Sequence, residues 1–109
     1  MAKSLNFQTR TKEYFNVTLP DGKKLLLTTP TKKVFDALTD LQHSLENVKD
    51  NDIDVIGGLY ESCAVIMCRN KTGAVITKEY LEEIFDISDI VTFFYSYIDF
   101  VHEIANSKN

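Results

Sequence analysis

Residues 14–28 read YFNVTLPDGKKLLLT, and this stretch decides how the chain begins to fold. Apolar side chains at positions 15, 17 and 19 alternate with polar ones at 16 and 18, which is the period of a half-buried strand. Pro20-Asp21-Gly22 then supplies a preset φ, a side chain that bonds to the local backbone and a residue that accepts positive φ. Residues 24–28 are therefore predicted to return as the second strand of a β-hairpin within residues 13–29. Because an isolated hairpin is only marginally stable, it must pack on the rest of the chain.

The segments on either side of the hairpin complete the fold prediction. For residues 1–12 two interpretations stay open: a flexible extension, or a third strand through Leu5-Asn6-Phe7. From residue 30 to residue 106 the apolar side chains follow helical periodicity. The sequence therefore predicts an α+β, mainly α fold, with an N-terminal β-hairpin followed by about four helices, the last one long. Residues 107–109 are expected to be a frayed tail.

The first two helices are placed by their caps and apolar faces. Thr29-Pro30 predicts the start of the first, because threonine caps helices and proline suits the first helical position. Its apolar face continues to Val48, and the second helix is predicted to run from the cap Asp52 to about Asn70. Gly57-Gly58 interrupts that second pattern, at about 1 kcal/mol for each glycine relative to alanine. Either the helix begins after the two glycines, or a neighbouring element packs closely against them.

The last two helices are predicted in the same way. Ala74-Val75-Ile76 is expected to be briefly extended before Thr77 caps a short helix over Lys78–Phe85. Asp86 or Ser88 then caps the long final helix, which runs to about residue 106. The central positions of the three long apolar stripes are expected to form one core: Leu38, Leu41, Leu59, Ile66, Phe94 and Ile98.

Length and composition indicate a single domain, residues 1–109. The chain has 109 residues, and its 44% of hydrophobic and 26% of charged residues are ordinary values for a globular protein. We find no apolar stretch long enough for a membrane span, and no apolar stretch near Met1 of signal-peptide length. The expected location is therefore the cytoplasm.

The common residue patterns of enzyme active sites and metal sites are missing from the sequence. Gly57-Gly58 lacks the lysine and hydroxyl that follow in a phosphate-binding loop, and His102-Glu103 stands alone. The acidic residues at 79–86 have the spacing of any solvated helix face. Cys63 and Cys68 lie five apart, which suits neither a zinc site nor a disulfide within one helix, so we expect two reduced, packed cysteines. We expect a protein that is not an enzyme, with no catalytic residue, no cofactor and no metal.

The charge is distributed unevenly along the chain, although the net value is only −4. Residues 1–33 hold seven basic groups against two acids, whereas residues 79–103 hold seven acids and no lysine or arginine. This asymmetry could orient copies of the chain head to tail, or it could be an ordinary solvated surface. The acidic C-terminal half disfavours nucleic acid as a partner.

Aromatic residues are concentrated in the last predicted helix. At helical spacing Phe93, Tyr97 and Phe100 form a stripe beside the core stripe, with Tyr95 near it. A stripe of this kind belongs either to a central helix that its own domain surrounds, or to an interface. We predict that Phe93, Tyr95, Tyr97 and Phe100 bind a partner chain, either a second copy or another protein, and that the protein forms a homo-oligomer.

Two segments resemble a known family of small proteins. Residues 15–38 read FNVTLPDGKKLLLTTPTKKVFDAL and join the hairpin to a helix through Thr-Pro-Thr-Lys-Lys. Residues 76–109 read ITKEYLEEIFDISDIVTFFYSYIDFVHEIANSKN and couple a short helix to a long one through Asp-Ile-Ser-Asp-Ile. Both are similar to tail-assembly-chaperone proteins of phages and prophages of low-GC Gram-positive bacteria. The resemblance covers roughly residues 13–109 and rests on overall pattern, because the family has no catalytic signature.

The resemblance implies a small helical protein of the host cytoplasm that binds the tape-measure and tail-tube proteins during assembly. It implies no cofactor, and from the charge and the lack of a long apolar stretch we expect neither nucleic acid nor a membrane as a partner. A structural tail-completion protein of the virion is the second hypothesis, and its presence in purified mature particles would favour that reading. A small enzyme or metal protein is the third hypothesis, and a metal analysis of the purified protein would test it.

Overall fold

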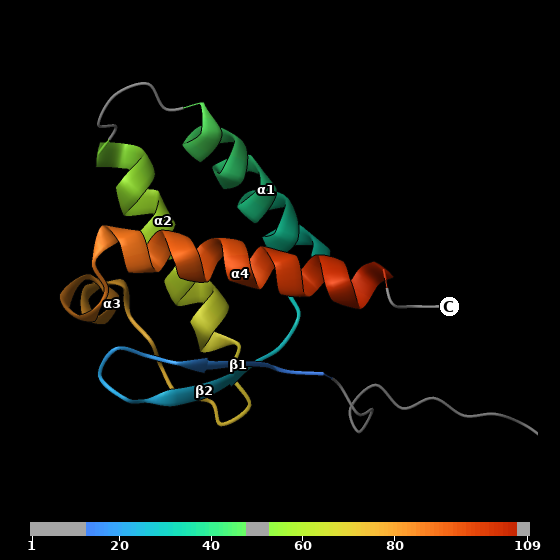
Figure 1. The fold of residues 1–109 in the computed structure, drawn as a ribbon, viewed down its shortest axis with the longest axis vertical. Helices are drawn as coiled ribbons and strands as arrows, with labels where there is room; N and C mark the ends of the chain where they lie inside the picture. Colours follow the sequence, from blue (N-terminus) through green and yellow to red (C-terminus); the bar gives the residue numbers. More distant parts are fainter. Residues whose placement is uncertain (1–12, 48–52, 107–109) are drawn as a thin grey trace, which may run out of the picture.

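A computed structural model describes residues 13–47 and 53–106, and it shows the predicted β-hairpin followed by four helices (Figure 1). The predictions for residues 1–12, for the caps and turn between 48 and 52, and for the tail 107–109 lie outside these described residues. α2 (Ile53–Cys68) is the central element, since it contacts α1, α3, α4 and strand β2. None of the described helices is both long enough and apolar enough to cross a membrane.

The hairpin forms where the alternating pattern predicts it. β1 (Phe15–Thr18) pairs with β2 (Lys24–Leu27) in antiparallel register, with Phe15 opposite Leu27. In the turn, the Leu19 amide donates to the Lys23 carbonyl at 2.7 Å, and Gly22 has φ +95°. The predicted positive φ at Gly22 is therefore confirmed.

The outer edge of β2 is paired with a segment that the sequence did not predict there. Residues 69–71, which follow α2, lie along this edge, and Leu27 forms an isolated antiparallel bridge with Asn70. The Thr28 amide donates to the Arg69 carbonyl at 3.0 Å, and the Lys71 amide donates to the Leu26 carbonyl at 2.9 Å. These bonds tie the hairpin to the C-terminal end of α2.

Helix α1 (Lys32–Glu46) begins two residues later than Thr29-Pro30 predicts. Thr31 is its cap, and its hydroxyl accepts from the Val34 amide at 3.4 Å. Thr29 and Pro30 therefore lie before the helix, and the prediction that Thr29 is its cap is wrong by two residues. The guanidinium of Arg69 donates to the carbonyl of Thr29 at 3.1 and 3.3 Å, which holds this segment against the end of α2.

The other two helices follow their predicted caps closely. α3 (Lys78–Ile84) is capped by the Thr77 hydroxyl, which accepts from the Tyr80 amide at 3.1 Å. α4 (Ile87–Asn106) begins behind Asp86, whose carboxylate accepts from the Asp89 amide at 2.7 Å, so Asp86 and not Ser88 is the cap. Residues 74–76 form neither helix nor strand.

One buried cluster joins the hairpin to α2, α3 and α4. Five of the six predicted core residues are buried in it, but the prediction for Leu41 is only partly right, because this side chain is half-buried at the edge of the cluster. The residue of α1 that is fully buried is Leu38. Helix α1 therefore adds one fully buried side chain to the core, packs Val34, Leu41 and Leu45 against its edge, and lies mainly on α2.

Candidate functional site

The aromatic stripe predicted to bind a partner lies largely inside the molecule. Phe93 and Tyr97 are buried, whereas Tyr95 and Phe100 are half-buried at the margin of the core. The expectation that this stripe is uncovered is therefore wrong for Phe93 and Tyr97.

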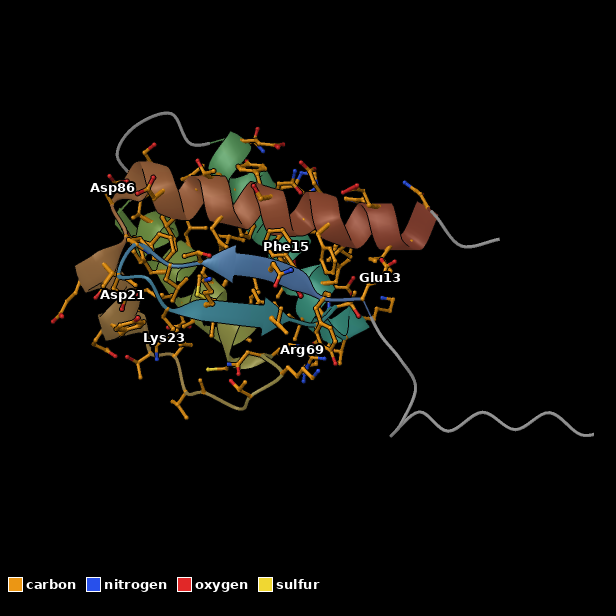
Figure 2. The ribbon with its side chains drawn as sticks, turned by 60° about the horizontal axis from the view of Figure 1, so that its bottom comes forward. Glu13, Phe15, Asp21, Lys23, Arg69 and Asp86 are labelled. Atoms are coloured by element: carbon orange, nitrogen blue, oxygen red, sulfur yellow. The ribbon has the colours of Figure 1, made fainter. Side chains whose placement is uncertain are left out.

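Phe15 of β1 is the residue that covers the stripe. Its ring lies 6.2 Å from that of Phe93, 6.0 Å from that of Tyr97 and 5.3 Å from that of Phe100. Figure 2 shows Phe15 between the hairpin and α4. The periodicity of α4 alone could not predict that the hairpin packs on this stripe, because the contact joins residues about 80 positions apart.

Tyr97 has a structural role in this contact. Its hydroxyl donates to the carbonyl of Thr28 at 2.6 Å, where β2 ends. Burial raises the pKa of the Tyr97 phenol to about 12. The stripe thus fixes the hairpin on α4, and only Tyr95 and Phe100 keep partly accessible surface for another chain.

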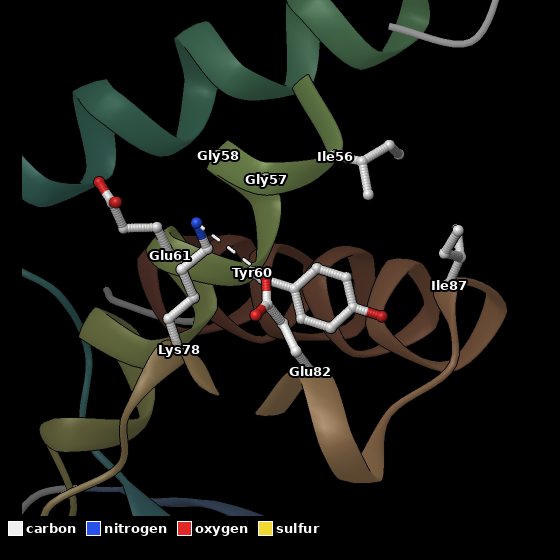
Figure 3. Close-up of a pocket in the computed structure, with 8 residues that line it drawn as sticks. All are labelled: Ile56, Gly57, Gly58, Tyr60, Glu61, Lys78, Glu82 and Ile87. Carbon is white, nitrogen blue, oxygen red and sulfur yellow. Dashed lines mark ion pairs between the residues drawn. The ribbon is translucent and has the colours of Figure 1, made fainter. Parts of the chain in front are cut away.

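A different surface offers a hollow, at the junction of α2, α3 and the start of α4 (Figure 3). This Gly57–Gly58 pocket has a volume of about 690 Å³. Its lining residues are Ile56, Gly57, Gly58, Tyr60, Glu61, Lys78, Glu82 and Ile87. Ile87, the first residue of α4, is 56% exposed on the rim.

The chemistry of the Gly57–Gly58 pocket differs between its two sides. Figure 3 shows Ile56 and Ile87 on one side of the Tyr60 ring and the charged side chains of Glu61 and Lys78 on the other. The Tyr60 hydroxyl donates to the carbonyl of Phe85 at 2.7 Å, so the ring is held as a fixed wall. The pocket therefore presents an apolar half beside a charged half.

Carboxylates dominate the electrostatics of this region. The ammonium of Lys78 forms an ion pair with Glu82 at 4.0 Å. Burial raises the pKa of the Tyr60 phenol, and the nearby carboxylates of Asp86 and Glu82 raise it further. A bound group would meet an overall negative field around an apolar surface.

The two glycines lie inside α2, so the reading that the helix begins after them is wrong. The helix begins at Ile53 and not after Gly58. A Cβ on Gly57 would lie 3.9 Å from the Lys78 ammonium nitrogen, and one on Gly58 would lie 3.9 Å from Leu41 Cδ1. These are ordinary van der Waals distances, so the described neighbours leave room for a methyl group at both positions.

A second, smaller groove lies between α1 and α2. It has a volume of about 240 Å³, and Val65 on its margin is 49% exposed. Its lining residues are Lys33, Val34, Ala37, Leu38, Ser62 and Val65. With one charged side chain among six, this groove suits apolar contact.

The two cysteines have different environments. Both are free thiols, and Cys63 is buried as predicted, with burial raising the pKa of its thiol. Cys68 is exposed, contrary to the expectation, and its sulfur contacts the backbone of Ile76, donating to the carbonyl at 3.1 Å. Among the residues that the structure describes, no group of three or more His, Cys, Asp or Glu side chains is arranged to hold a metal ion.

Comparisons with protein-family models, with curated proteins and with solved structures gave no match. The sequence signal that could have located the pocket was the unexplained Gly57-Gly58 pair, because a helix interior rarely carries two glycines without a packing or functional reason. The other lining residues come from α3 and α4, and only the folded chain brings them to the glycines.

Proposed function

We propose that the protein is a non-catalytic interaction protein of the phage tail-assembly-chaperone type. It acts in the host cytoplasm and binds the tape-measure and tail-tube proteins before they assemble. The resemblance of residues 15–38 and 76–109 to that family supports the choice of partners. The observation that carries the proposal is the Gly57–Gly58 pocket of about 690 Å³, with the exposed Ile87 on its rim. The apolar half of this pocket, with Ile87 on its rim, offers contact area to an apolar side chain of a partner.

Self-association belongs to the same proposal but uses less surface than the sequence indicates. Since Phe93 and Tyr97 are buried beneath Phe15, a homo-oligomer through the aromatic stripe would rest on Tyr95 and Phe100. The double variant Tyr95→Ser with Phe100→Ser tests this interface by light scattering. Dissociation of an oligomer with the helical circular dichroism retained is the expected result, and an unchanged mass would place the contact elsewhere.

The test of the function is co-expression with the tape-measure protein encoded in the same tail gene cluster. The expected result is a higher soluble yield of that protein and its co-elution with this chain. A tape-measure protein whose solubility and elution stay unchanged contradicts the proposal, as does a genome with no such gene near this one. Finding the chain in purified mature particles, at a stoichiometry typical of tail subunits, would favour the tail-completion role instead.

A further inference from the structure

The Gly57-Gly58 pair indicates that the pocket binds a segment of another molecule. Each glycine in a helix interior costs about 1 kcal/mol relative to alanine. A small residue is normally retained where a neighbour approaches closely, but here both positions have room for a methyl group within the described structure. Both glycines are half-buried and line the pocket, so an incoming segment could approach the helix backbone there more closely than it could beside a larger side chain.

The rest of the lining indicates what kind of segment would fit. Ile56, Ile87 and the face of Tyr60 offer apolar contact on one side of the glycines. On the other side Lys78 is ion-paired with Glu82, and Glu61 adds a second carboxylate to the lining. Asp86 and Asp89 at the start of α4 add further negative charge near Tyr60. Apolar contact flanked by excess carboxylates complements a segment that combines an apolar side chain with lysine or arginine.

We infer that the Gly57–Gly58 pocket receives a segment of a partner protein that places an apolar side chain between Ile56 and Ile87 and a lysine or arginine beside Glu61 and Glu82. This inference rests on the proposed function as an interaction protein and names the surface and the chemistry of the partner. A symmetric contact between two copies of this pocket is disfavoured, because it would bring like charges together.

Glycine amide signals provide a direct readout of binding, since the chain has four glycines and two of them lie in the pocket. The probe is a synthetic peptide of about 14 residues with leucine at helical spacing and lysine on the opposite face. In a ¹⁵N-correlated NMR titration, the Gly57 and Gly58 signals are expected to shift while Gly22 and Gly73 stay in place. A peptide with glutamate in place of each lysine is the control and should leave all four signals unchanged.

Variants separate docking from folding. Gly57→Ala should raise the melting temperature, because alanine favours the helix and has room there. The same variant should lower the affinity for the peptide about tenfold, because the methyl group takes up space in the pocket. Glu82→Gln should weaken binding about threefold, whereas the matched variant Glu103→Gln, at the far end of α4, should not.

Several results would overturn the inference. Equal shifts at all four glycines would do so, as would equal binding of the glutamate peptide or an unchanged peptide affinity in Gly57→Ala. Shifts of the Gly57 and Gly58 signals with protein concentration alone would mean that a second copy occupies the pocket. Failure of this titration with intact tape-measure capture would refute the pocket and leave the proposed function standing. Loss of tape-measure capture with intact peptide binding would refute the proposed function and leave the pocket as a peptide-binding site.

Discussion

Tyr97 is a fully buried aromatic residue whose hydroxyl has a defined partner, the carbonyl of Thr28 at 2.6 Å. Tyr97→Phe keeps the ring contacts with Phe15 but leaves that carbonyl without this donor. The free energy of unfolding should fall by about 1 kcal/mol, the usual net value of such a hydrogen bond. Urea denaturation followed by circular dichroism measures it.

The control for this variant is Tyr14→Phe. The Tyr14 ring is half-buried beside the ammonium of Lys71, and phenylalanine preserves that contact. Its stability should stay within about 0.5 kcal/mol of the original chain. Equal losses of unfolding free energy in the two variants would show that the Tyr97 hydroxyl does not form the hydrogen bond to the Thr28 carbonyl.

The two thiols should differ sharply in reactivity. Cys68 is exposed, whereas Cys63 is buried and burial raises the pKa of its thiol, which lowers the reactive thiolate fraction. Native protein treated with a maleimide and analysed by mass spectrometry should gain one label, at Cys68, and a second only in denaturant. Rapid labelling of Cys63 in native protein would contradict its burial among α2 and its neighbours.

At the scale of elements, the parts predictable from sequence were those with local signals. The hairpin follows from alternation around Pro20-Asp21-Gly22, and the starts of α3 and α4 follow from the caps Thr77 and Asp86. The pairing of residues 69–71 with β2, and the burial of Phe93 under Phe15, had no local signal because both join distant segments. For the same reason the Gly57–Gly58 pocket was visible in the sequence only as an unexplained glycine pair.

The hairpin turn depends on the backbone of Gly22. Its φ of +95° is strained for a residue with a side chain, although nothing lies within 4 Å of the position that a Cβ would occupy. Gly22→Val should therefore lower the free energy of unfolding by more than about 1 kcal/mol through backbone strain alone. A thermal melt checks it, and an unchanged melting temperature would mean that the turn adopts another conformation.

Helix α1 should respond very differently at two neighbouring apolar positions. Leu38 is 1% exposed and points into the core, whereas Leu41 is half-buried at its edge. Leu38→Ala should cost about 2–5 kcal/mol, and Leu41→Ala clearly less, because its cavity opens to solvent. Chemical denaturation of both variants gives the comparison, and equal costs would mean that α1 is rotated from its described orientation.

At the scale of the whole molecule, buried phenols make the fold sensitive to high pH. Burial is the main cause that raises the pKa of Tyr60 and of Tyr97, the latter to about 12, above the ordinary value of 10. The folded state therefore holds these protons more tightly than the unfolded state does. The contribution of Tyr97 is fully present below about pH 10 and is lost as pH rises through about 12, and the contribution of Tyr60 is lost in the same direction.

Thermal melts between pH 8 and pH 12 test this sensitivity. The melting temperature should decline from about pH 10 upward, in step with the ultraviolet signal of phenolate formation. In Tyr97→Phe the decline should be shallower, because one of the buried phenols is gone. A melting temperature that stays flat to pH 12 would show that these hydroxyls are solvated in the folded protein.

The pairing of residues 69–71 with β2 also limits how the protein can polymerise. A fibre built by strand addition needs two open sheet edges in each molecule, because each molecule must pair with a neighbour on both sides. Here residues 69–71 pair with the Leu26–Thr28 part of the outer edge of β2, so among the described residues this stretch is closed to an added strand, whereas no strand is paired with the outer edge of β1. In two molecules joined through β1, both outer edges would already carry residues 69–71 beside Leu26–Thr28, so a third strand could pair with that stretch of β2 only by displacing those residues.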